Sequence, residues 1–204
     1  MKTFGKIMFT DAVQALQKTD GSFETYARIT ERPAPDGLGP DEAAFIESRD
    51  SFYMATVNAD GWPYIQHRGG PRGFLKVLGP TKLGFADYRG NRQFVSSGNL
   101  AGDDRVALFL MDYARHARLK ILGHAAVTSM DDADEMLLDR LAAPGSGRVE
   151  RVFTIEVDAF DWNCPQFIPT KFSEDEVREV VGTRIAELEA ENARLKDLIA
   201  KSGA

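Results

Sequence analysis

Two short glycine-rich corners of the chain carry arginines in a pattern that fits the binding of an anion. The first is HRGGPRG at residues 67–73, and the second is YRGNR at residues 88–92. A phosphate monoester needs about two compensating charges and several donors, which guanidinium groups and glycine backbone N–H groups supply. Each corner alone is more typical of a turn with solvated arginines. The two together predict one phosphate-binding neighbourhood, with a helix that begins at Asn91 and directs its N–H groups at an anion beside Arg92.

No other pattern of residues predicts catalysis by protein side chains. The sequence has no nucleophile elbow, P-loop or dinucleotide-binding glycine motif. A single cysteine, Cys164, excludes an internal disulfide, and histidines at 67, 116 and 124 offer no spacing for zinc, so no metal site is expected. Because a chain without disulfides suits a reducing compartment, we expect a cytoplasmic protein.

Composition and charge exclude several classes of protein. The chain has 204 residues, 43% hydrophobic and 27% charged, which is enough for one sizeable core. With a net charge of −6, the protein lacks the overall positive field that drives sequence-independent nucleic-acid binding. The longest strongly apolar run, Val106 to Met111, is too short to span a membrane, and the N-terminus lacks the apolar stretch of a signal peptide. We therefore expect neither a nucleic-acid partner nor a membrane.

The elements that must position the two corners are mostly short strands. Apolar and alternating segments predict strands at residues 51–58, 62–68, 74–78, 82–87, 105–112, 118–129 and 151–160. Helices are expected at residues 11–18, 40–49, 91–97 and 131–141. Many short strands with few helices favour a small barrel over an alternating βα sheet. We divide the chain into a lead-in over 1–39, a barrel domain over 40–172 and a C-terminal helix over 173–204.

From Glu174 onward the pattern changes to that of a coiled coil. Alternating spacings of four and three define heptad d and a positions at Val181, Ile185, Leu188, Asn192, Leu195 and Ile199. Ile at a, Leu at d and one Asn at a favour a parallel two-stranded coil. Arg184 and Glu191 at g would face Glu189 and Lys196 at e of the partner. The tail thus predicts a homodimer, and the alternative is an amphipathic helix that folds onto its own barrel.

The stretch from Ser51 to about Val127 resembles the FMN-binding split-barrel proteins related to pyridoxamine phosphate oxidase. The resemblance is carried by GWP at 61–63, HRGG at 67–70, GFLKV at 73–77, FADYRGNR at 85–92, SGN at 97–99, RVAL at 105–108 and RLKILG at 118–123. It implies a mainly β fold with flanking helices, built on a six-stranded antiparallel split β-barrel. It also implies a homodimer with FMN at the subunit interface.

The resemblance further implies which residues bind FMN. The phosphate would be held by Arg68, Gly69, Arg72, Lys76, Gly90, Asn91 and Arg92. His67, next to Arg68, is either a further phosphate contact or a structural histidine. The ribityl and ring region would be lined by Phe74, Phe85, Ala86 and Asp87. Arg118 would face the flavin ring from a strand whose same face carries Lys120. Trp162 and Gln166 would reach the flavin of the partner as minor contributors.

An FMN-dependent oxidoreductase is the function that the resemblance implies. The flavin would accept a hydride from NAD(P)H or a small donor, and a cation such as Arg118 would stabilise the negative charge of the reduced ring. The alternatives are a non-catalytic flavin-binding or carrier protein, and a split barrel that binds haem or a deazaflavin. The C-terminal segment of the oxidases is rich in arginines that bind the substrate phosphate. At the corresponding place this chain has residues 171–173, KFS, followed by the heptad tail. Oxidation of pyridoxamine phosphate itself is therefore not expected.

Overall fold

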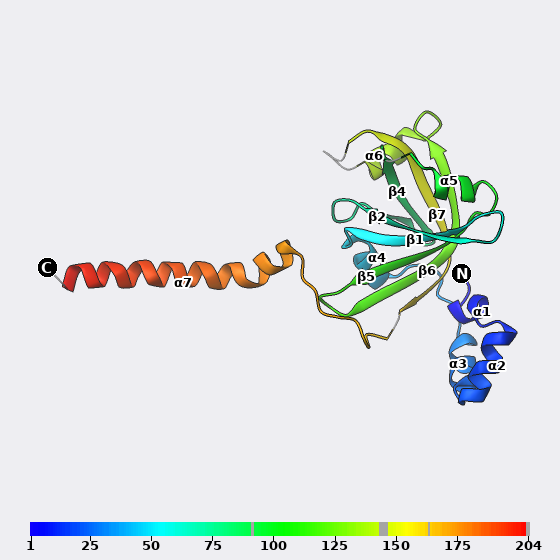
Figure 1. The fold of residues 1–204 in the computed structure, drawn as a ribbon, viewed down its shortest axis with the longest axis horizontal. Helices are drawn as coiled ribbons and strands as arrows, with labels where there is room; N and C mark the ends of the chain where they lie inside the picture. The colour runs from blue at the N-terminus through cyan, green and yellow to red at the C-terminus, as the bar shows by residue number, and fades with distance from the viewer. Residues whose placement is uncertain (91, 143–146, 163, 203–204) are drawn as a thin grey trace. The chain divides into compact units, whose positions relative to one another are not determined.

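The computed structural model of the chain describes residues 1–90, 92–142, 147–162 and 164–202 (Figure 1). These residues form two compact units, residues 1–112 with 117–165 and residues 113–116 with 166–204. The first unit contains a curved β-sheet with short helices, and the second contains one long helix.

The sheet is fully antiparallel and has seven strands in the order β2-β1-β5-β6-β7-β4-β3. The strands are β1 (Ser51–Val57), β2 (Pro63–Gly69), β3 (Lys76–Gly79), β4 (Lys82–Tyr88), β5 (Arg105–Asp112), β6 (Ala117–Ser129) and β7 (Val149–Trp162). All seven strand segments predicted from the sequence are present. The expectation of six strands was wrong for this sheet, because the four residues of β3 pair with β4 and add a seventh strand at the edge.

The core lies inside the curve of the sheet and follows the alternation of each strand. In β1, for example, Phe52 and Met54 are buried whereas Tyr53 between them is exposed. Phe85 of β4 stacks on Phe153 of β7 with ring centroids 4.8 Å apart. Strand β2 differs, because none of its residues is buried. The inner side of this edge strand therefore faces a hollow rather than the core.

Three short helices precede the barrel: α1 (Phe4–Met8), α2 (Asp11–Asp20) and α3 (Phe23–Thr30). The predicted helix at 11–18 is confirmed as α2, whose first turn is capped by the Thr10 side chain. A backbone hydrogen bond of 2.8 Å from Lys2 to Asp158 ties the start of the chain to β7.

The remaining helices of the first unit are α4 (Pro40–Glu47), α5 (Val95–Leu100) and α6 (Glu135–Leu141). Helix α4 begins at proline, as predicted, and its Glu42 carboxylate accepts a hydrogen bond from the Gly39 N–H. Just beyond α4, Arg49 forms an ion pair of 2.7 Å with Asp112 of β5, and both side chains are at least nine-tenths buried. This pair fastens the end of α4 to the barrel.

The second unit contains α7 (Glu174–Ser202). Its predicted start at Glu174 is confirmed, and Ser173 and Glu176 cap its first turn reciprocally. Across the described residues, no helix combines the length and apolar character needed to cross a membrane.

Candidate functional site

The two arginine-bearing corners meet at a pocket of about 210 Å³ on the inner side of β2. Arg68 comes from β2, Asp87 from the end of β4, and Arg92 from the segment that follows β4. Arg151 of β7 completes the charged lining. Arg68 and Arg92, one from each corner, therefore line the same pocket, whereas Arg72 of the first corner does not. The pocket exists because β2 directs Tyr64, Gln66 and Arg68 inward where the other long strands direct apolar side chains.

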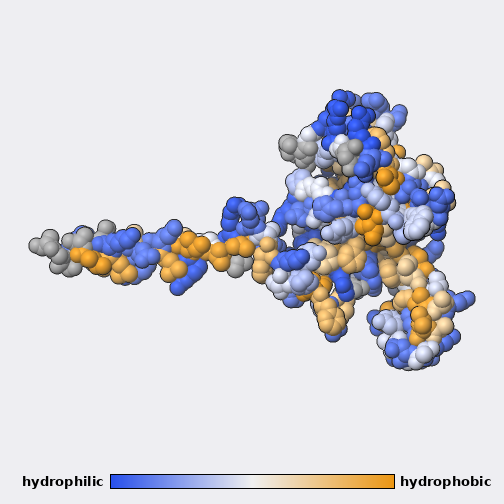
Figure 2. All heavy atoms as spheres, viewed as in Figure 1, coloured by the Kyte–Doolittle hydropathy of each residue, from blue (hydrophilic) through white to orange (hydrophobic). Residues whose placement is uncertain are grey.

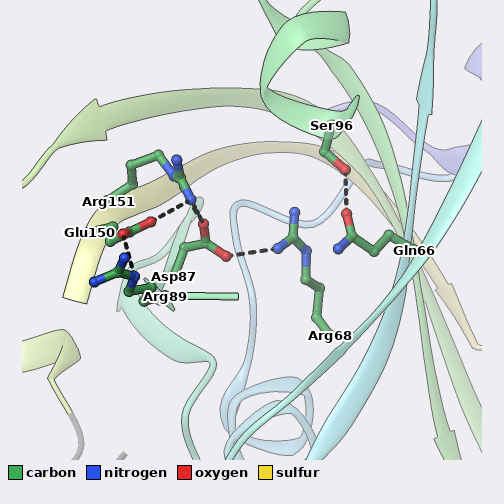
Figure 3. Close-up of polar contacts among 7 residues, drawn as sticks. All are labelled: Gln66, Arg68, Asp87, Arg89, Ser96, Glu150 and Arg151. Carbon is green, nitrogen blue, oxygen red and sulfur yellow. Dashed lines mark hydrogen bonds and ion pairs between the residues drawn. The ribbon is translucent and has the colours of Figure 1, made fainter. Parts of the chain in front are cut away.

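Asp87 connects two of these arginines (Figure 3). One carboxylate oxygen accepts a hydrogen bond of 2.8 Å from Nη1 of Arg68. The other oxygen accepts bonds of 2.9 Å and 2.7 Å from Nε and Nη2 of Arg151. Glu150 lies 3.4 Å from Arg151 and 3.9 Å from Arg89. Both oxygens of Asp87 are thus used to fix guanidinium groups at the pocket wall.

Aromatic rings of the core support Arg68 from below. Its guanidinium carbon lies 4.9 Å from the centre of the Phe153 ring and 5.6 Å from that of Phe85. Only 11% of the Arg68 side chain is exposed. Burial lowers the pKa of Arg68, and the neighbouring Asp87 carboxylate opposes that change. A guanidinium group stays protonated even when it is buried in this way, so Arg68 gives the pocket a fixed positive charge.

The charge of the pocket matches a dianion. Its charged lining residues are the three arginines 68, 92 and 151 and the single carboxylate of Asp87, which leaves an excess of two positive charges. A phosphate monoester carries up to two negative charges near neutral pH. Arg92 is exposed at the pocket, whereas Arg68 and Arg151 are mostly buried. The lining therefore offers a phosphate two fixed guanidinium groups and one that can close on it from solvent.

A second hollow of about 470 Å³ adjoins the first and shares Arg92, Phe94 and Arg151 with it. It adds Arg89 and Arg148 to the basic lining. The Phe94 ring lies between the two shared arginines, 4.8 Å from the guanidinium carbon of Arg151 and 5.8 Å from that of Arg92. Because Asp131 and Glu150 line it as well, the second hollow adds no net positive charge to that of the pocket.

The segment after β4 is not helical at the predicted position. Helix α5 begins at Val95, and Arg92 and Phe94 adopt left-handed backbone conformations with φ of 59° and 56°. The expected helix start at Asn91 was therefore wrong, and the argument from helical N–H groups does not apply to this turn. Asn91 itself lies outside the described residues. Helix α5 instead fastens β2, because the Ser96 hydroxyl donates a hydrogen bond of 2.9 Å to Gln66 (Figure 3).

Three residues predicted to line the cofactor are packed in apolar clusters. Phe74 and Phe85 belong to the main core, with 5% and 1% exposure. Ala86 is 6% exposed and packs with Leu141 on the other face of β4. Their side chains do not line the pocket, and only Asp87 of the predicted ribityl and ring group does so. Along residues 85–87 of β4, Phe85 thus points into the core, Ala86 to the face covered by α6, and Asp87 into the pocket.

His67, Arg118 and Lys120 lie on the outer face of the sheet. Register pairing aligns His67 with Tyr53, Tyr53 with Phe109, and Phe109 with Lys120 in one row across four strands. Arg118 stands opposite Met111 beside this row. The His67 ring meets Tyr53 edge to face at 5.5 Å. Since neighbouring residues of β2 point to opposite faces, His67 and Arg68 serve different sides of the sheet.

The other predicted residues are dispersed. Gly69 ends β2, Arg72 is exposed in the turn that follows, and Lys76 begins β3. None of these three lines the pocket. Gln166 is exposed and belongs to the second compact unit. The structure therefore does not bring Gly69, Arg72 and Lys76 to the pocket that holds Arg68 and Arg92. The binding roles of these three residues and of Gln166 stay predictions.

A larger cavity of about 800 Å³ lies between the N-terminal helices and the end of β7. Lys120 and Trp162, both predicted as cofactor contacts, line this cavity together with Cys164. Lys120 forms an ion pair of 2.8 Å with Asp161 and lies 4.4 Å from the centre of the Phe4 ring. The Trp162 indole N–H donates a hydrogen bond of 2.6 Å to Glu42.

Arg151 is the charged residue of the pocket lining that the sequence analysis missed. It stands directly opposite Asp87 in the pairing of β4 with β7, although 64 positions separate them in the chain. The available signal was a cluster of charges, RVER at 148–151, at the start of a strand that then alternates apolar and polar residues. Within the described parts of the chain, no group of His, Cys, Asp or Glu residues could hold a metal ion.

Comparison with solved structures finds similar folds of low sequence identity. HupZ of Group A Streptococcus is 14% identical, with a TM-score of 0.49 over 66% of this chain and 100% of that one. A putative pyridoxamine 5'-phosphate oxidase of Lactobacillus delbrueckii is 21% identical, with a TM-score of 0.48 over 62% and 95%. An FMN-binding protein of Syntrophomonas wolfei is 9% identical, with a TM-score of 0.48 over 72% and 97%.

Among curated proteins, none matches the sequence. The pyridoxamine 5'-phosphate oxidase family, in contrast, matches residues 38–160, which include β1 through most of β7 and every residue that lines the arginine pocket. This match covers more than half of the chain, and the predicted family is thereby confirmed. The protein belongs to the pyridoxamine 5'-phosphate oxidase family.

Proposed function

We propose that this protein is an FMN-dependent oxidoreductase that binds the phosphate of its flavin in the arginine pocket. Membership of the pyridoxamine 5'-phosphate oxidase family supports a flavin-linked role. The single observation that carries the proposal is the convergence of Arg68, Arg92 and Arg151 on one pocket with an excess of two positive charges. A phosphate monoester is the part of FMN that this charge fits.

The described residues fit the phosphate in a defined manner. Asp87 holds both Arg68 and Arg151, and the Phe153 and Phe85 rings pack against Arg68, before any ligand arrives. Such preorganisation reduces the entropy cost of binding, because the charged groups already have their bound orientation. Arg92, which is exposed, would close on the phosphate from the solvent side. Bound FMN would supply the hydride-accepting chemistry, with NAD(P)H or a small organic molecule as donor.

The outer face of the sheet is the second element of the proposal. Ile65, Ala55, Ala107 and Leu122 form an apolar row across β2, β1, β5 and β6, next to the row that contains His67 and Lys120. Ile65 is 66% exposed and Tyr53 42%. We assign this face to a homodimer contact with a second copy, which would bury the apolar row. Arg118 and Lys120, on the same outer face, would then lie beside the subunit seam.

Flavin binding is tested first by the absorbance of the purified protein. Flavin bands that are released with FMN on denaturation support the proposal, whereas a Soret band would identify a haem protein and contradict it. The affinity of the stripped protein for FMN is then measured by fluorescence quenching. Arg92→Ala should weaken binding roughly 10- to 150-fold, the value of one charge-assisted hydrogen bond.

A matched control comes from Arg105, another exposed arginine of the same unit that pairs with Asp103 outside the pocket. Arg105→Ala should leave FMN affinity unchanged. If the Arg92 and Arg105 variants bind FMN with equal affinity, Arg92 does not bind the FMN phosphate as proposed.

Turnover separates an enzyme from a flavin carrier. Anaerobic addition of NADH or NADPH to the FMN-loaded protein should bleach the flavin absorbance. A protein that binds FMN but is bleached by neither nicotinamide nor a panel of small hydride donors would be a carrier.

A further inference from the structure

Helix α7 has an exposed apolar stripe along its length. Val181, Leu188 and Leu195 are 39%, 47% and 43% exposed, and Ile185 and Ile199 are 50% and 70% exposed. Figure 2 shows hydrophobic residues running along the helix beside hydrophilic ones. We infer that this stripe pairs in parallel and in register with α7 of a second copy of this chain.

The stripe has the spacing of a coiled-coil seam rather than that of a helix packed on a globular core. Its residues recur by four and three, so they return to the same side of the helix every seven residues. The apolar face is narrow, because Glu189 and Lys196 flank it at e positions and Arg184 and Glu191 flank it at g positions. Leu198 widens it at the last g position. Such a narrow seam is what two paired helices bury, whereas a core-facing helix needs a wider apolar face.

Asn192 selects the orientation and the register. It occupies an a position in the middle of the stripe, between Leu188 and Leu195. A buried Asn amide is satisfied at low cost when it faces the same amide of its partner. That match occurs only when the two helices run parallel with no shift.

Charges beside the seam identify the partner as a second copy. Arg184 at g would face Glu189 of the partner subunit at e, and Glu191 would face Lys196 of the partner subunit in the same way. Both contacts attract, and each occurs twice in a symmetric pair. Within one helix, Arg184 contacts Glu187 at 3.0 Å and Arg194 contacts Glu191 at 2.8 Å. Arg184 and Glu191 are exposed by 68% and 49%, so both are accessible to a partner helix.

Disulfide capture in the full chain tests the pairing. With Cys164 replaced by Ser, single cysteines are introduced by Val181→Cys near one end of the seam and by Leu195→Cys near the other. Mild oxidation should convert each variant to a covalent dimer on non-reducing gels. Ala190→Cys, at position f on the opposite side of the helix, should remain monomeric under the same conditions. Equal dimer yields from all three would show random collision and overturn the proposal.

Orientation is read from the same variants. In a parallel pair, Val181→Cys and Leu195→Cys each form a disulfide with their own copies. In an antiparallel pair, d positions face a positions, so Val181→Cys would form a disulfide only when mixed with Ile199→Cys, and that result would overturn the parallel pairing. Failure of both variants to oxidise, alone and mixed with Ile199→Cys, would place the stripe against another surface, including the chain's own barrel, and would exclude the proposal.

Charge reversal tests the identity of the partner. In the Val181→Cys background, Arg184→Glu should lower the extent of pairing roughly 2- to 30-fold, because two attractive contacts become repulsive. Adding Glu189→Arg should restore it, since the pair is then reversed but complementary. Arg194→Glu, at position c and similarly exposed, should have little effect. Loss of pairing that Glu189→Arg does not restore would contradict the assigned contacts.

Discussion

Arg68 and Asp87 join two strands that have no hydrogen-bonded pairing with each other. Their ion pair of 2.8 Å runs from β2, at one end of the sheet, to β4, next to the other end. It therefore crosses the open side of the barrel, where the inner face of β2 lacks apolar side chains. The same carboxylate also fixes Arg151. One acidic residue thus closes the sheet and orients two cations of the candidate phosphate site.

The first prediction concerns Asp87→Asn. This change leaves two mostly buried guanidinium groups without their main carboxylate, so it should lower the free energy of unfolding by about 1–3 kcal/mol. Urea unfolding of the flavin-free protein measures the effect. Glu150→Gln is the control and should cost less than about 1 kcal/mol, because Arg151 keeps its contacts with Asp87. If both variants unfold at the parent urea concentration, Asp87 does not close the barrel.

A second prediction concerns Arg151, which the sequence analysis did not select. Arg151→Ala should weaken FMN binding roughly 10- to 150-fold, because the pocket loses one of its two preorganised guanidinium groups. Fluorescence quenching on the stripped protein measures the dissociation constant. Arg148→Ala should have a smaller effect, since Arg148 lines only the adjoining hollow. An affinity loss of the same size in both variants would mean that the phosphate is not confined to the pocket.

Local patterns were enough to predict the strands. The buried positions of β5 and β6 alternate with period two, and their predicted bounds at 105–112 and 118–129 agree with the structure to within one residue. The charges before the apolar seam of α7 placed its start at Glu174 correctly. Pattern alone could not show that β3 would be only four residues long, because its neighbour Phe74 looks strand-like but packs into the core before the strand begins.

The site was predicted only where neighbours in the chain remain neighbours in space. Arg68 and Arg92 were found because each lies in a glycine-rich corner, whereas Asp87 was named from the family resemblance, for the ribityl and ring region. Arg151 was missed because strand register, not sequence proximity, brings it to Asp87. His67 was grouped with Arg68 although alternation in β2 sends it to the outer face. The register of the strands and the side of the sheet to which each side chain points are set by the tertiary fold. Together they decide which charged side chains share a pocket.

A third prediction uses the buried ion pair of Arg49 with Asp112. Asp112→Asn should lower the free energy of unfolding by about 3–5 kcal/mol, because it leaves a guanidinium group uncompensated in a buried site. Arg49 also donates a hydrogen bond of 3.0 Å to the Met111 carbonyl, which a substitution at 112 leaves in place. Urea unfolding at neutral pH measures the change.

A double-mutant cycle isolates the contribution of that pair. Arg49→Met combined with Asp112→Asn should destabilise the protein by less than the sum of the single changes, since the second substitution removes a charge that has already lost its partner. Additive effects would show that the two residues act independently.

The last prediction is a pH dependence that arises from His124 on β6. Its Nδ1 lies 2.7 Å from Asp104 and its Nε2 lies 3.2 Å from Asp158, so both ring nitrogens face carboxylates. The hydrogen bond with Asp104 raises the pKa of His124, and both carboxylate charges contribute in the same direction. A raised folded-state pKa means that the stabilisation is fully present below the unfolded value of about 6.5 and is lost as pH rises through the folded value.

Because the His124 side chain is 45% exposed, solvent screening keeps this contribution below about 1 kcal/mol. The parent and His124→Gln should therefore differ most in unfolding free energy at about pH 5.5 and least at about pH 8.5. Urea unfolding across that range, repeated at about 1 M salt to screen the carboxylates, measures the difference. A difference that grows toward alkaline pH would reverse the sign of the argument and exclude a charged His124 as the stabilising species.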